Sequence, residues 1–167
     1  MNFIKSTLIS ITAALTVAAP SLARVEAGTA DLIKTLQANG VSVVINGSDC
    51  QGGKHGSYRF TGMKRQLNLC PGRSVDAEDH DTVRHETWHA IQHCVNASRG
   101  TPSNTPVSTN KAKWMEFVKE YVPYELAQRI IAGYPKEHHY VELEAFAAAN
   151  AFTAAQLQDM FIKACTM

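Results

Sequence analysis

The stretch His85-Glu86-Thr87-Trp88-His89 lies within residues 76–97, a segment that we predict to form a helix. Side chains four positions apart lie on the same face of an α-helix. His85 and His89 can therefore direct an imidazole nitrogen at one ion, while Glu86 lies close enough to contact a water molecule beside it. Two imidazoles and a neighbouring carboxylate in this spacing are typical of a catalytic zinc site, so we expect the fold to be organised around this helix.

A catalytic zinc ion uses three protein ligands, so a third must come from another segment. The best source is residues 137–151, an alanine-rich stretch with helical character that carries two acids. Helical phase places Glu142 on the same face as Ala145 and Ala149, whereas Glu144 points to the other side. Small side chains allow that face to approach another helix closely. We therefore favour Glu142 as the third ligand and keep Glu144 as the alternative.

The H-E-x-x-H motif followed by a helix that reads E-x-x-A, at Glu142 and Ala145, resembles the gluzincin group of zinc metallopeptidases. In that group the helical glutamate is the third zinc ligand, and a small residue three positions later faces the motif helix. The resemblance covers roughly residues 57–150. One departure is Phe146, because many members carry an acidic residue at that position.

The resemblance implies a zincin-like domain with one Zn²⁺ per chain, held by His85, His89 and Glu142. It also implies hydrolysis of peptide bonds, with Glu86 as the general base that takes a proton from the attacking water. A further hydrogen-bond donor usually stabilises the developing negative charge. The candidates are three residues just before Glu142, although polar surface residues are the simpler interpretation of all three: His138, His139 and Tyr140.

The remaining pattern predicts an α+β fold in one domain, with a small antiparallel sheet before the motif helix and a helical part after it. Helix 29–39 ends at Gly40, and the alternating or β-branched segments 41–45, 57–61 and 65–70 predict strands. Strand 65–69 could bind an extended peptide if it formed a sheet edge. Further helices are expected at 111–121, 124–132 and 137–151, and a capping box at Thr153 begins the last one.

Residues 1–23 have the features of a secretory signal peptide. Lys5 is the only charge before Arg24, an apolar run covers residues 8–19, and Ser21-Leu22-Ala23 has the small-x-small ending of a cleavage site. We expect cleavage after Ala23, which leaves residues 24–167 as a secreted or periplasmic domain; an uncleaved anchor is the alternative.

Four cysteines, none in a C-x-x-C pair, argue for two disulfides in an exported chain rather than a cysteine zinc site. Three pairings are possible, and we favour Cys50–Cys70 and Cys94–Cys165. The first would enclose a hairpin, and the second would join the motif helix to the C-terminal helix.

Charge argues against nucleic acid as a partner, and hydropathy argues against a membrane span. Residues 1–23 hold one lysine and no acid, so the 16 basic residues fall to 15 without them and match the 15 acidic ones. No basic footprint for nucleic acid is visible, and no second apolar segment predicts a membrane span after signal cleavage. The expected partner is a peptide or protein substrate. The alternative is a non-enzymatic exported binding or structural domain held together by its disulfides or by zinc.

Overall fold

The computed structural model describes residues 28–50, 55–62, 64–70 and 77–166. The predicted signal peptide, residues 1–23, lies outside the described residues. Among those described, no helix is both long and apolar enough to cross a membrane.

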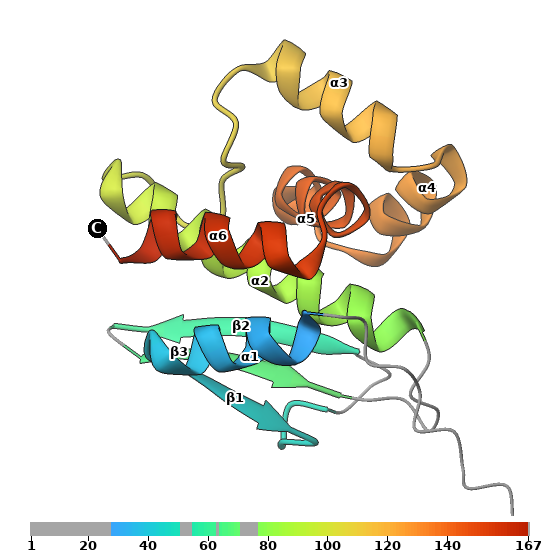
Figure 1. Ribbon diagram of the computed structural model, residues 1–167. Helices are drawn as coiled ribbons and strands as arrows, with labels where there is room; N and C mark the ends of the chain where they lie inside the picture. The colour runs from blue at the N-terminus through green and yellow to red at the C-terminus, as the bar shows by residue number, and fades with distance from the viewer. Residues whose placement is uncertain (1–27, 51–54, 63, 71–76, 167) are drawn as a thin grey trace, which may run out of the picture.

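Helices and strands follow the predicted order, which confirms the α+β class (Figure 1). The first strand has the predicted bounds, the bounds of the other two differ from the predicted ones by at most one residue, and a short 3₁₀ helix, η1, precedes α5. The elements are α1 (Thr29–Ala38), β1 (Val41–Ile45), β2 (Gly56–Thr61), β3 (Lys64–Leu69), α2 (Ala77–Ser98), α3 (Lys111–Tyr121), α4 (Tyr124–Gly133), η1 (Lys136–His138), α5 (His139–Ala151) and α6 (Ala154–Cys165).

The sheet is mixed, so the prediction of an antiparallel sheet was wrong. Its strand order is β1-β3-β2, with β1 parallel and β2 antiparallel to β3. The central strand is β3, whose residues Leu67 and Leu69 are buried. Alternation along a strand identifies its buried face but not its neighbours, which is why the sequence pattern left strand order open. Because β3 is paired on both sides, it cannot offer a peptide the free edge that we had considered for it.

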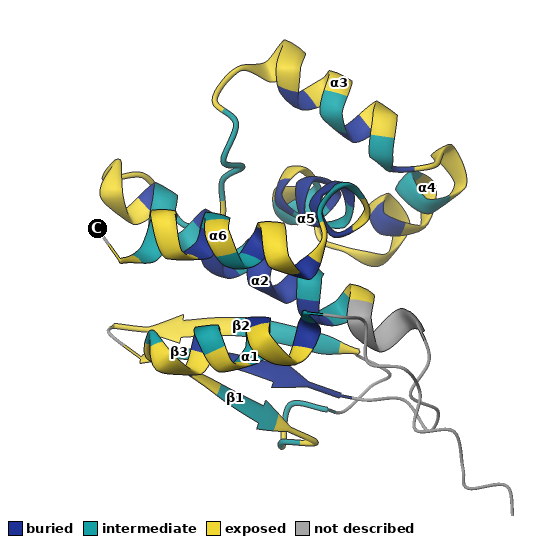
Figure 2. Ribbon diagram, viewed as in Figure 1, coloured by how far each residue is buried: buried dark blue, intermediate teal, exposed yellow. Residues whose placement is uncertain are grey.

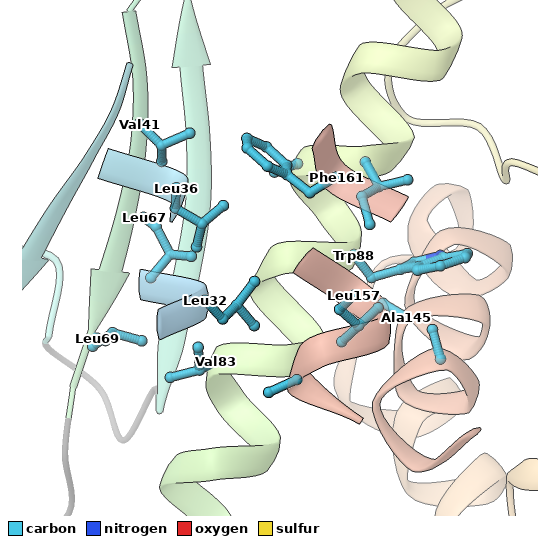
Figure 3. Packing of buried hydrophobic residues seen from close by; sticks show 14 residues of the cluster. Leu32, Leu36, Val41, Leu67, Leu69, Val83, Trp88, Ala145, Leu157 and Phe161 are labelled. Atoms are coloured by element: carbon cyan, nitrogen blue, oxygen red, sulfur yellow. The ribbon is translucent and has the colours of Figure 1, made fainter. Parts of the chain in front are cut away.

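Helices α1 and α2 cover one face of the sheet. The main hydrophobic core lies between these helices and that face. Figure 3 shows Leu32 and Leu36 of α1 facing Leu67 of β3 and Val83 of α2. The other face carries a polar cluster around the buried Asn68, which donates to Ser57 and Asp49. The apolar face therefore fixes α2 against the sheet.

A helical layer packs on the far side of α2 (Figure 1). Leu157 and Phe161 of α6 and Ala145 of α5 belong to the main core, and a second cluster that includes Trp114 and Leu143 joins α3, α4 and α5. The middle of α2 is therefore buried between two layers (Figure 2). The motif helix thus has protein on both sides, which holds its side chains in place.

Both favoured disulfides are present. Cys50–Cys70 closes a loop that contains the β2–β3 hairpin, and Cys94–Cys165 joins α2 to the end of α6. The predicted capping box also forms, because Thr153 and Gln156 exchange side-chain hydrogen bonds with each other's backbone N–H groups. The second disulfide holds α6 on the motif helix.

Candidate metal centre

Three ligand atoms converge where α5 crosses α2. The Nε2 atoms of His85 and His89 are 3.1 Å apart, and the Oε2 atom of Glu142 lies 3.3 Å from the first and 3.6 Å from the second. A tetrahedral zinc ion with ligand distances of about 2.0–2.1 Å holds its ligand atoms about 3.3–3.5 Å apart. The three separations bracket this range, so the group has the size of a zinc site.

The chemistry of these groups also favours a proton or a metal ion between them. Two neutral imidazoles that face each other through Nε2 would repel through their lone pairs unless a proton or a metal ion lay between them. The buried Glu142 Oε2 has no well-aligned hydrogen bond within the described part of the chain. An orphaned carboxylate oxygen beside two facing imidazoles is the donor set that a divalent cation satisfies.

The close approach of Glu142 to the two histidines also shifts the pKa values of these groups in the metal-free site. Burial lowers the pKa of His89, but the hydrogen bond and charge of Glu142 outweigh it and raise that pKa to about 9. Burial raises the pKa of Glu142, and the two imidazoles outweigh it and hold that pKa well below its usual range. A metal ion that binds here therefore replaces a proton.

Close packing of the two helices brings Glu142 to the histidines. Ala145 and Ala148 of α5 are fully buried in the core that α5 shares with α2. Because neither carries more than a methyl group, the helix backbones approach closely. Glu142 lies one turn before Ala145, on the side predicted from helical phase.

Glu86 lies beneath the edge strand β2. Its carboxylate accepts a hydrogen bond from the Tyr58 backbone N–H. A Cβ at Gly56 would stand only 3.1 Å from Glu86 Cγ and 2.6 Å from Thr82 Cγ2, so the absence of a side chain there lets β2 approach α2. Burial raises the pKa of Glu86 more than the charges of His85 and His89 lower it, and a raised pKa suits a carboxylate that must accept a proton near neutral pH.

The structure does not bring Glu144, the alternative third ligand, to the histidines. Its side chain is buried on the opposite side of α5 and accepts four hydrogen bonds. The donors are the Trp88 indole, the Gln92 amide and the backbone N–H groups of Val107 and Ser108. Glu144 therefore anchors the loop that precedes α3 to the motif helix.

The three residues considered as donors to the reaction lie elsewhere. His139 and Tyr140 line an apolar cavity of about 470 Å³ between α3, α4 and α5. His139 Nε2 donates to the Tyr134 carbonyl oxygen, and Tyr140 packs edge-on against Trp114. His138 ends η1 as a half-buried residue. None of the three belongs to the group formed by the two histidines and Glu142.

Two further residues at the site were not singled out from the sequence. Burial raises the pKa of Tyr134, and the charges of Glu142 and Glu86 raise it further, so its phenol lies within electrostatic range of both carboxylates. Gln92 accepts a hydrogen bond from His89. A polar residue one turn after a ligand histidine was the available signal for Gln92, whereas Tyr134 reaches the site only through the turn between α4 and α5.

Comparison of this chain with protein-family models, with curated proteins and with solved structures finds no match in any of the three. The geometry of the site therefore carries the functional argument.

Proposed function

We propose that this protein is a zinc-dependent hydrolase that cleaves peptide bonds. His85, His89 and Glu142 would hold one zinc ion, and Glu86 would act as the general base. The observation that carries the proposal is the convergence of three ligand atoms within 3.1–3.6 Å, with a buried carboxylate adjacent to one of them in sequence. A structural zinc site has no use for a second acid beside its ligands.

A bound zinc ion would polarise the substrate carbonyl as a Lewis acid and make a water molecule acidic enough to attack it. Glu86 accepts the proton of that water and returns it to the leaving amine. The Tyr58 N–H holds the Glu86 carboxylate in one orientation, and the two histidines present neutral Nε2 atoms to the ion.

The edge of β2 that faces away from β3 pairs with no strand in the described part of the chain, and it supports an extended peptide as the substrate. Cys70 N–H donates to the His55 carbonyl, and by the alternation of antiparallel pairs the same inward pairing recurs at Ser57 and Arg59. The backbone groups of Tyr58 and Phe60 consequently point away from β3. A peptide that adds to this edge as a further strand would pass Glu86, to which Tyr58 is already bonded.

Replacement of Glu86 by glutamine tests the proposal. E86Q should keep one zinc per chain and lose at least about 100-fold in kcat/KM on a mixture of peptides whose cleavage is followed by mass spectrometry. Glu116→Gln, on the exposed side of α3, is the matched control and should retain full activity. A wild-type protein that binds zinc but cleaves nothing would favour the alternative of a non-enzymatic, zinc-stabilised domain. Activity that survives E86Q would remove Glu86 from its role.

Tyr134 is the donor that we propose for the negative charge developing on the carbonyl oxygen. Its phenol is near Glu142 and Glu86, and 39% of the residue is exposed, so it can meet a substrate. Tyr134→Phe should lower kcat by about 100-fold or more at unchanged zinc content. Tyr140→Phe is the control, because Tyr140 lines the apolar cavity between α3, α4 and α5. This variant should leave kcat unchanged.

We also propose that the protein is secreted or periplasmic. Two disulfides are compatible with an extracytoplasmic location, since such bonds persist in oxidising compartments. The signal-like residues 1–23 support the same location, and N-terminal sequencing of the exported protein should show Arg24 as its first residue.

A further inference from the structure

We infer that Gln92 is a positioning residue for the metal site and that Glu144 locks it in the orientation needed to fix His89. The inference rests on the proposed zinc site, but it concerns residues that are not ligands and do not contact the substrate.

The orientation of the Gln92 side chain follows from its partners. Its Nε2 atom lies 2.9 Å from Glu144 Oε2 and 3.1 Å from the Val141 carbonyl oxygen. Both partners are acceptors only, since an ionised carboxylate and a carbonyl have no proton to donate. The amide nitrogen must therefore face them, and the Gln92 oxygen must point the other way. Gln92 is 1% exposed, so water offers no competing arrangement.

That orientation determines the tautomer of His89. The Gln92 Oε1 atom lies 2.7 Å from His89 Nδ1, and an amide oxygen can only accept. Nδ1 must consequently carry a proton, which leaves the lone pair of the neutral ring on Nε2. Nε2 is the atom that faces His85 and Glu142. Gln92 thus selects the ring state and the ring angle that a metal ion requires.

His85 provides an internal comparison. Its Nδ1 atom is buried and has no hydrogen-bond partner among the described residues. The Phe146 ring lies against it, with centroids 4.4 Å apart. On the Nδ1 side, only packing orients the His85 ring, whereas a hydrogen bond to Gln92 orients the His89 ring. The polar contact that orients a ligand imidazole ring through Nδ1 is therefore the one between Gln92 and His89.

Helix α5 acts on His89 from both sides. Glu142 faces the metal side of the ring, and Glu144, two residues later, reaches the other side through Gln92. Glu144 is itself held by the backbone N–H groups of Val107 and Ser108, one on each carboxylate oxygen, so it cannot follow Gln92 if that side chain moves. The lock is rigid because it is buried and fully hydrogen-bonded.

The test compares Gln92→Met with Trp88→Phe. Each variant removes one donor to the same Glu144 oxygen, but only Q92M also removes the acceptor for His89. Zinc affinity, measured by competition with a chromophoric chelator, should fall about 10–100-fold in Q92M. In W88F it should stay within about threefold of wild type, and unfolding of the metal-free proteins would report the general loss of stability that both share.

A second measurement needs no variant. In the zinc-loaded wild type, long-range ¹H–¹⁵N correlation spectra should show His89 as the Nδ1–H tautomer, with a proton that exchanges slowly with water. In Q92M that proton should exchange at least tenfold faster while the His85 signals stay in place. An Nε2–H tautomer at His89 in the wild type would overturn the inference even if Q92M did not fold.

The outcomes separate this inference from the proposed function. Wild-type protein that binds zinc without cleaving peptides would refute the peptidase proposal and leave the affinity test intact. Equal zinc affinity in Q92M and wild type, or equal losses in Q92M and W88F, would overturn the role of Gln92 alone. A wild-type chain that binds no zinc would overturn both.

Discussion

Two faces of α5 carry the same side chain in opposite settings. On one face, Glu142 lies against two imidazoles, and its buried oxygen lacks an aligned N–H donor in the described structure. On the other, Glu144 accepts four N–H groups. A buried carboxylate needs donors or a cation. The partners of a buried acid, rather than its burial, therefore show whether it anchors the fold or is available to a ligand.

The strongest test of this comparison is the loss of Glu142. Glu142→Ala removes one of three ligands, so zinc affinity should fall by more than the roughly 10–100-fold typical of a lost outer hydrogen-bond partner. Zinc per chain after dialysis is the measurement. Above about pH 9, where His89 is neutral, the metal-free variant should unfold close to wild type, because the pair of protonated His89 and Glu142 no longer contributes. Full retention of zinc would contradict the assignment.

The converse change, loss of Glu144, should act mainly on stability and should reach the metal site only through Gln92. Glu144→Ala leaves four donors without their acceptor in a buried site, which should cost about 3–5 kcal/mol of unfolding free energy. Denaturant unfolding of the metal-free protein measures this, with Glu125→Ala on the exposed side of α4 as control. If E144A were as stable as wild type, Glu144 would not be an anchor.

The spacing of the two helices offers a smaller perturbation. Ala145→Leu should push α5 away from α2, at a cost of about 1–3 kcal/mol from overpacking, and weaken zinc binding by separating Glu142 from the histidines. Ala112→Leu, at an exposed site on α3, controls for the added leucine. An A145L protein with lower stability but unchanged zinc affinity would show that the site tolerates the displacement.

The pH dependence of the metal-free protein tests the Glu142 side of α5 without a metal. Because Glu142 raises the pKa of His89 to about 9, above its usual 6.5, the protonated pair stabilises the metal-free protein below pH 6.5, and this stability is lost as pH rises through 9. Thermal unfolding between pH 6 and 10 should show that loss. E142Q should flatten the curve. A sloping curve in E142Q would mean that another group is responsible.

The sequence alone determined much of the candidate site. The i, i+4 spacing of His85 and His89 requires only a helix, and helical phase distinguished Glu142 from Glu144 because the two residues are 200° apart on α5. Cysteine positions led to the favoured pairing. The first two inferences are local, since each depends on one helix, whereas the pairing of Cys94 with Cys165 spans 71 residues.

Only the tertiary structure decided the rest. Strand order, the free edge of β2 and the approach of Gly56 to Glu86 depend on which elements pack together, and alternation along a strand does not encode that. The same holds for Gln92, Glu144 and Tyr134, whose roles come from partners far away in the chain. The position of a residue in a helical or strand repeat predicts the direction of its side chain. The chemistry of that side chain depends on the groups that the fold places opposite it.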